Sequence, residues 1–159
     1  MTADSYTLHM HVRADILQAF EGALNGVPIV AAVYTSNGTA TPPTGKVTVE
    51  LGFVEEEPPK RISGKMPNEA VLLRTVIVGA RVAAAVPRDF TAKQFEADIL
   101  GPIETAIATC EALAPLCEDW IPGVTQWQAA QDGSSQSLDA VMSWKVTYQH
   151  AAATPGIPL

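Results

Sequence analysis

The sequence has few charged residues and no long uninterrupted apolar run. Charged side chains make up 17% of the 159 residues, and ten Lys and Arg stand against seventeen Asp and Glu, for a net charge of −7. Proteins that neutralise many phosphates carry clustered basic residues, so this balance argues against sequence-specific DNA recognition. Arg74 and Arg81 interrupt the longest apolar run, so we predict no span of the roughly 20 residues that cross a bilayer. Residues 1–10 lack the basic start and apolar stretch of a secretory signal, which favours a cytoplasmic product.

Cysteine and histidine are equally sparse. Cys110 and Cys117 have the spacing of neither a redox pair nor a zinc site, and we interpret them as two buried free thiols. His9 and His11 are two residues apart, which on a helix separates them by about 200° and prevents them from sharing a metal. Together with His150 they are interpreted as solvated or capping side chains. No metal site is predicted.

Apolar residues are abundant, at 47% of the chain, which excludes disorder and suits a single folded domain. A chain of this size buries roughly two-thirds of the surface that its unfolded form exposes, so it needs no disulfide or metal to hold a core. We expect one α+β domain over residues 1–150 and an extended C-terminal tail over residues 151–159. The surplus apolar surface is interpreted as reserved for a partner or for further copies of the chain.

Two segments have the apolar periodicity of amphipathic helices. The first ends at Gly26 and Pro28. Its apolar residues recur at intervals of four: Leu8, Val12, Ile16, Phe20 and Leu24. The second begins where Thr91 and Gln94 have the spacing of a capping box, and its apolar face continues to Leu113. Within it, the proline of residues 101–102 should kink or split the helix.

Strand patterns occupy much of the remaining chain. Apolar and polar residues alternate over 46–53 and again over 142–149, while residues 124–131 and a turn at 132–135 complete a final hairpin with the last strand. The apolar segment 70–86 predicts a long strand covered on both faces, with Gly79 marking a bulge or a close backbone approach. Helix is the rival interpretation for that segment, because its alanines would tolerate one.

The sequence predicts loops in two segments. Residues 35–45 are rich in Ser, Thr, Gly and Pro, and Glu55–Pro67 is charged and broken by prolines. The order of elements is therefore a helix, two strands joined by a long exposed loop, a second helix and a hairpin. This order predicts an α+β fold, with a mostly antiparallel sheet of about four or five strands and two helices packed on one face.

No constellation of residues in the sequence points to catalysis. There is no nucleophile elbow, phosphate-binding loop, dinucleotide-binding turn or His-Glu-x-x-His helix. The three consecutive glutamates at 55–57 lie in a segment too exposed to raise a carboxyl pKa. Glu118 and Asp119, beside Trp120, are explained equally well by a loop after a helix. We therefore predict no catalytic residues, no cofactor-binding residues and no cofactor.

The net charge is unevenly distributed along the chain. Residues 89–119 carry seven acidic side chains and one basic side chain, whereas residues 55–88 carry six basic and four acidic ones. A solvated helix is the simpler interpretation of the acidic segment. The functional interpretation is that opposite patches on neighbouring copies meet head-to-tail, which closes into a ring when the rotation permits.

The order of elements and the closing strand Val141–Tyr148 resemble those of the tail terminator (minor tail U-like) proteins of long-tailed bacteriophages, over roughly residues 8–149. The resemblance implies a structural virion protein and not an enzyme, made in the host cytoplasm and located at the head-proximal end of the tail. It implies a ring, as a hexamer, that ends tube polymerisation and meets the tail tube protein and the head connector protein. DNA would pass through the lumen without specific binding, repelled by an acidic wall. Tail tube and head–tail connector proteins are alternatives within the same virion.

The resemblance also points to candidate contacts with a neighbouring subunit or partner. The segment Glu55–Pro67 is long and unable to form its own core, and charged residues elsewhere complete the set. The candidates are Glu55, Glu56, Glu57, Lys60, Arg61, Lys65, Arg74, Arg81, Glu96, Glu104 and Glu111. An alternative from another class is a small α+β ligand-binding domain or enzyme, with Trp120, Trp127 and Trp144 lining a pocket between sheet and helices.

Overall fold

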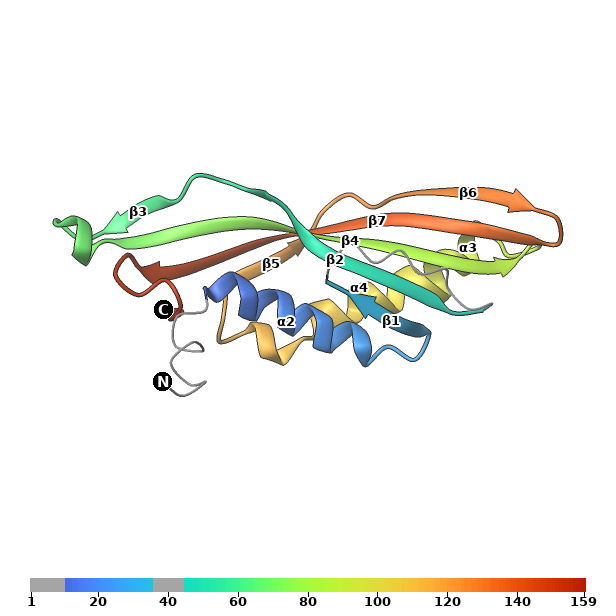
Figure 1. Cartoon of the computed structure of the whole chain (residues 1–159), viewed down its shortest axis with the longest axis horizontal. Coiled ribbons are helices and arrows are strands. Elements are labelled where there is room, and N and C mark those ends of the chain that lie inside the picture. The colour runs from blue at the N-terminus through green and yellow to red at the C-terminus, as the bar shows by residue number, and fades with distance from the viewer. Residues whose placement is uncertain (1–10, 36–44) are drawn as a thin grey trace.

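The computed structural model describes residues 11–35 and 45–159. In these residues one long, twisted sheet runs the length of the molecule, and helices cover the middle of one of its faces (Figure 1). The sheet has seven strands, in the order β1-β2-β4-β7-β5, with β3 also paired to β4 and β6 also paired to β7. The strands are β1 (Val30–Tyr34), β2 (Val47–Glu56), β3 (Lys60–Ser63), β4 (Val71–Pro87), β5 (Asp119–Pro122), β6 (Gln126–Asp132) and β7 (Ser135–Ala151). The predicted α+β class is confirmed, with more strands than the four or five expected.

The antiparallel pair of β4 and β7 determines the shape of the molecule. Each strand has 17 residues, and they pair along their whole length, from Val71 opposite Ala151 to Pro87 opposite Ser135. At about 3.3 Å per residue such a strand is roughly 55 Å long. The helices are much shorter than this, so both ends of the sheet extend beyond them (Figure 1).

The two faces of the sheet differ in burial. Alternate residues of β4 and β7, such as Val78 and its partner Trp144, are fully buried beneath the helices. The residues between them face the other way and are half-buried or exposed, including Arg81 and Val141, except for Gly79, which Val54 covers. The prediction that segment 70–86 is covered on both faces is therefore wrong, because the described helices pack on one face only. We call the uncovered side the open face.

Gly79 marks a close approach of a side chain, and not the bulge or close backbone approach that its position in the strand predicted. The register of β4 is unbroken there, and the irregularity lies in β2, between Phe53 and Glu55. The side chain of Val54 crosses the glycine, and a Cβ at position 79 would lie 2.5 Å from Val54 Cγ2. The neighbouring strand therefore carries the bulge that was expected in β4.

The first helix, α2 (Val12–Asn25), forms as its periodicity predicts. Val12, Ile16, Phe20 and Leu24 are all fully buried against the sheet, whereas Leu8 lies outside the described residues. The ring of Phe20 meets that of Trp144 edge-on at 5.5 Å between centroids. None of the helices in the described ranges is long and apolar enough to cross a membrane.

The second helical segment is interrupted, as its proline predicted. It consists of α3 (Ala92–Phe95), the π-helical turn η2 (Glu96–Leu100) and α4 (Gly101–Ala108), followed by the short 3-10 turn η3 (Glu111–Leu113). The predicted capping box is present, because Gln94 N–H donates to Thr91 Oγ1 and Thr91 N–H donates to Gln94 Oε1. Gly101 N–H donates to Glu96 O, five residues back. Pro102 has no N–H to donate, so a wider turn accommodates it.

The predicted loop over Glu55–Pro67 is only partly a loop. β2 continues through Glu56, β3 forms at Lys60–Ser63, and the 3-10 turn η1 (Pro67–Glu69) leads into β4. The segment is nevertheless largely exposed, as expected. The other loop, predicted over 35–45, lies almost entirely outside the described residues.

Candidate functional site

A basic arm projects at one end of the sheet. The arm, which we define as residues 60–69, comprises β3, the turn after it and η1, and it lies beyond the helices at the left of Figure 1. All ten residues are exposed. Three of them are basic: Lys60, Arg61 and Lys65. Two large apolar side chains, Ile62 and Met66, are 49% and 58% exposed, so the arm presents both positive charge and unburied apolar surface.

Gly64 determines how the arm folds back on the sheet. Its φ of +94° lies in the left-handed region, which residues with a Cβ rarely adopt. A Cβ at this position would also overlap the carbonyl oxygen of Glu69 and lie 2.7 Å from Ala70 Cα. β3 then pairs with β4, with Lys60 opposite Leu73. Glycine therefore allows the tip of the arm to close tightly against the start of β4.

An apolar groove with acidic residues beside it lies on the helical side of the molecule. It is open, has a volume of about 590 Å³ and runs between the end of α2 and the segment formed by η2 and α4. We call it the helix groove, and its lining is Gly26, Val27, Pro28, Ala97, Gly101, Pro102, Thr105 and Ala106. Glu96, Asp98 and Glu104 belong to the same helical segment and are exposed.

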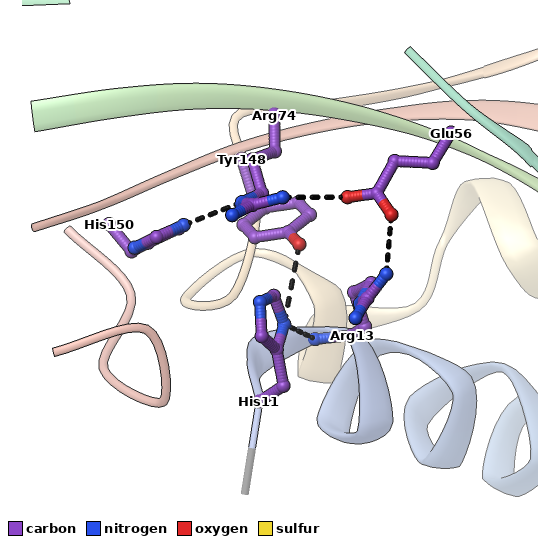
Figure 2. A network of polar contacts seen from close by, with 6 residues as sticks. All are labelled: His11, Arg13, Glu56, Arg74, Tyr148 and His150. Carbon is purple, nitrogen blue, oxygen red and sulfur yellow. Dashed lines mark hydrogen bonds and ion pairs between the residues drawn. The ribbon is translucent and has the colours of Figure 1, made fainter. Parts of the chain in front are cut away.

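A polar network connects the base of the arm to the body (Figure 2). Glu56, at the end of β2, accepts from both Arg74 and Arg13. The contact with Arg74 Nη1 measures 2.9 Å, and the contact with Arg13 reaches the first turn of α2. One carboxylate thus joins β2, β4 and α2 at the point where the sheet leaves the helices.

His11 and Tyr148 extend this network. His11 caps α2, its Nδ1 accepting from Arg13 N–H at 3.3 Å, and the hydroxyl of Tyr148 lies 3.5 Å from the same nitrogen. Burial, followed by the positive charge of Arg13, lowers the pKa of His11 below its ordinary value of 6.5. Burial raises the pKa of Tyr148 to about 12. The network is therefore built around a neutral imidazole and a protonated phenol.

The interpretation of the histidines is correct only in part. His11 is a capping residue as predicted, and His9 lies outside the described residues. His150 is 1% exposed, so its interpretation as a solvated or capping side chain is wrong. In the described part of the chain no three His, Cys, Asp or Glu side chains converge on a possible metal position.

An ion pair lies in the middle of the open face. Arg81 Nε and Nη2 donate to the two carboxylate oxygens of Asp139, at 3.0 and 3.2 Å. This hydrogen-bonded carboxylate raises the pKa of Arg81. Val141, 52% exposed, stands beside the pair and borders two shallow depressions that share it with Arg81. The centre of the open face thus has the Arg81–Asp139 pair, Glu50 opposite Arg81 on β2, and an uncovered apolar side chain.

The structure divides the eleven candidate contact residues into two groups. Four of them form ion pairs within the chain: Glu56, Glu57, Arg74 and Arg81. The partner of Glu57 is Lys145, at 3.4 Å. The other seven are exposed and form no ion pair with another described residue: Glu55, Lys60, Arg61, Lys65, Glu96, Glu104 and Glu111. Five of these seven belong to the basic arm or to the helical segment of the groove.

Sequence reasoning missed the intrachain partners and the apolar residues of the arm. Arg13, Asp139 and Lys145 are far from their partners in sequence. The packing of α2 on the sheet brings Arg13 to Glu56, and the assembly of the strands brings Asp139 and Lys145 to their partners. Arg74, for example, is opposite Tyr148 in the β4–β7 pair. The alternation of residues in the last strand was a signal for this, because it assigns Tyr148 and His150 to one face.

The three tryptophans have separate environments. Trp144 is buried in the core, and Trp127 meets Phe95 edge-on at 5.4 Å between centroids. Trp120 is half-buried, and its Nε1–H donates to Ile107 O at 2.9 Å. Each tryptophan thus packs against a different element instead of lining one shared pocket.

The chain was compared with known proteins at three levels. No family model matches it, and no curated protein sequence matches it. Among solved structures it is similar to a chain from the "virion of native gene transfer agent (GTA) particle", with a TM-score of 0.29 and 12% sequence identity, over 92% of this chain and 99% of that chain.

Proposed function

We propose that the chain is a structural virion protein that joins copies of itself head-to-tail into a ring, in the tail terminator role that its sequence resembles. The observation that carries this proposal is the separation of two complementary surfaces. The basic arm lies at one end of the long sheet (Figure 1). The helix groove lies between the end of α2 and the segment of η2 and α4, which also carries exposed carboxylates. The arm pairs with β4 at the end of the sheet, beyond the helices that form the groove (Figure 1). In a head-to-tail assembly the arm of each copy can contact the groove of the next copy.

A ring follows from the use of two different surfaces. A contact between unlike patches repeats from copy to copy, and it closes into a ring when the rotation per copy divides a full turn. A closed hexamer of this kind would cover the end of a tube and stop its growth. The tail tube protein would meet one side of the ring and the head connector protein the other. A filament would form in place of a ring if the rotation did not close.

The sheet edge at β6 also supports assembly. Among the described residues β6 pairs only with β7, and it has one charged residue, Asp132, and no proline over seven residues. Natural monomeric proteins usually protect such an edge with charge, proline or a bulge. In contrast, the edge strand β3 carries Lys60 and Arg61. An unprotected edge suits a chain whose edge becomes covered by a neighbour.

The charge of the chain agrees with DNA passage. At a net charge of −7, a ring of several copies is strongly acidic, and an acidic lumen would repel phosphates and prevent DNA from sticking. A lumen lined by Lys or Arg in an imaged ring would contradict this part of the proposal. The DNA would thus be a passing partner and not a bound one.

The test is the assembly state of the full chain, alone and with tail tube protein. We expect light scattering to show an oligomer at high concentration and negative-stain images to show rings with a central hole. Added to polymerising tube protein, the chain should shorten the tubes and sit at one end. Self-stacking into tubes would favour the tail tube alternative, and binding only to connector rings would favour the connector alternative. A chain that stays monomeric with and without tube protein would contradict the proposal.

A further inference from the structure

We infer that the basic arm of one copy docks in the helix groove of the next copy. This inference rests on the head-to-tail assembly proposed above and specifies the contact that makes it. The occupant of the groove is then residues 60–69 of a second chain. The arm and the groove are both partly apolar, they carry opposite charges, and both are ordered before docking.

The apolar parts of the two surfaces match in kind. Ile62 and Met66 are large side chains with about half their surface exposed, although the body of the protein buries most of its own. The groove is lined mainly by small apolar residues, including Ala97, Gly101 and Ala106, which leave room for larger side chains to enter. Docking would remove both apolar surfaces from water, and this is the main favourable contribution to association.

The charged residues of the arm are mainly basic, whereas those of η2 and α4 are acidic. Lys60 and Arg61 precede Ile62, and Lys65 precedes Met66. On the groove side, Glu96 and Asp98 flank Ala97, and Glu104 precedes Thr105. All six charged side chains are exposed. Lys46 also reaches the groove, where its Nζ donates to the carbonyl oxygen of Pro28 at 3.1 Å, and the three carboxylates of the helical segment outnumber it. Opposite charges around an apolar contact speed encounter and fix its register, and an acidic partner would be repelled from this groove.

Both surfaces are held in place before docking. The arm is paired to β4 and folded at Gly64, and its base is fixed by the carboxylate of Glu56 between Arg74 and Arg13. The groove is formed by the π-turn ahead of Pro102 and by a helix start held by its capping box. Surfaces that are already ordered lose less conformational entropy on binding. A small contact that combines apolar burial with opposite charges can then hold two copies in one defined orientation.

A cross-linking experiment tests the contact directly. Met66→Cys and Thr105→Cys are made on separate full-length chains in a Cys110→Ser background, in which Cys117 remains buried. We expect a disulfide-linked dimer when the two proteins are mixed and oxidised, and little when either is oxidised alone. The matched control pairs Met66→Cys with Val124→Cys, an exposed position outside the groove that is 79% exposed. Equal cross-linking to the control would overturn the inference.

A charge exchange provides the second measurement. Lys60→Glu with Arg61→Glu should raise the concentration for half-assembly at least tenfold, and so should Glu96→Lys with Glu104→Lys. Mixing the two variants should restore assembly, because arms and grooves are then complementary again across the mixed contacts. Circular dichroism identifies any variant that fails to fold, and the cross-linking pair then decides. Rings that form unchanged in both variants would overturn the docking inference and leave the ring proposal standing, whereas a wild-type chain that never self-associates would overturn both.

Discussion

Arg74 and His150 lie on the two neighbouring long strands, and the Nε–H of Arg74 donates to Nε2 of His150 at 2.7 Å. His150 Nδ1 lies 2.8 Å from Ala151 O, so this second nitrogen must be the donor toward the carbonyl. A guanidinium can only donate, which fixes one tautomer for the imidazole. Beyond it the chain folds back, with Leu159 N–H donating to Gln149 O at 3.1 Å and Val12 N–H donating to Pro155 O at 3.2 Å. The network therefore connects the C-terminal segment to both the sheet and α2.

The first prediction is that the free energy of unfolding decreases in mild acid. The pKa of His11 is lowered in the folded protein by burial and by Arg13, Arg74 and His150, with Glu56 opposing. The unfolded chain therefore takes up a proton at a higher pH than the folded chain. The contribution of His11 to the free energy of unfolding is fully present above the ordinary pKa of 6.5. It is lost as the pH falls through the lower pKa of the folded protein. Urea unfolding at intervals from pH 8 to pH 5 measures this slope.

The matched control for that prediction is His11→Asn. Asparagine is a good N-cap residue, so this variant keeps a side-chain acceptor for α2 and removes only the titrating ring. We expect a flatter dependence of stability on pH for this variant. A slope identical to that of the unmodified chain would show that His11 does not couple folding to protons.

The second prediction concerns Glu56, which accepts from two arginines. Glu56→Gln removes both ion pairs at once and leaves the positive charges of Arg13 and Arg74 without this carboxylate partner. We expect a loss of about 1 kcal/mol, because partly exposed pairs each contribute about 0.2–1 kcal/mol. Asp139→Asn is the control, since it breaks a single and more exposed pair with Arg81. Chemical denaturation that shows equal losses for both variants would contradict a joining role for Glu56.

The sequence predicted the elements whose pattern is local. The four-residue spacing of Val12, Ile16, Phe20 and Leu24 identified α2, and the spacing of Thr91 and Gln94 identified the second helix start. The alternating residues of β2 and of the last strand were equally clear. The capping pair lies within four residues of the sequence, and the helix and the strands each have one apolar face that repeats at a regular spacing.

The strands that were missed depend on partners distant in sequence. β3 has the sequence Lys-Arg-Ile-Ser, is fully exposed, and forms because β4 extends far enough beyond the body to pair with it. β5 is four residues long and ends at Pro122, yet it pairs with β7. The same long-range register placed Asp139 beside Arg81. Three of the seven residues in the ion pairs, Arg13, Asp139 and Lys145, could therefore be recognised only after the sheet and its helices were assembled.

The third prediction concerns the two thiols. Cys117 is buried, its Sγ–H donates to Leu113 O at 3.2 Å, and burial raises its pKa to about 12. Thiolate is the reactive form, so Cys117 should react with iodoacetamide at pH 8 only after unfolding. Cys110 is half-buried, so the prediction of two buried thiols is correct only for Cys117, and Cys110 should react first. Mass spectrometry of Cys110→Ser during a urea titration measures this, and rapid alkylation in native buffer would contradict it.

The fourth prediction separates the folding of the arm from the folding of the body. Gly64→Ala places a Cβ where φ is +94° and where it would overlap Glu69 and Ala70, so the tip of the arm must move. Gly45→Ala is the control, because its φ of +76° is also left-handed but no atom of the described residues lies within 4 Å of the new Cβ. The control should lose about 1–2 kcal/mol of stability through the backbone conformation alone. Gly64→Ala should instead abolish the hydrogen-exchange protection of the β3 amides that pair with β4 and weaken self-assembly, with the buried amides of β4 and β7 still protected. Unchanged protection of β3 in Gly64→Ala would show that the close contact of the tip with residues 69 and 70 does not determine the fold of the arm.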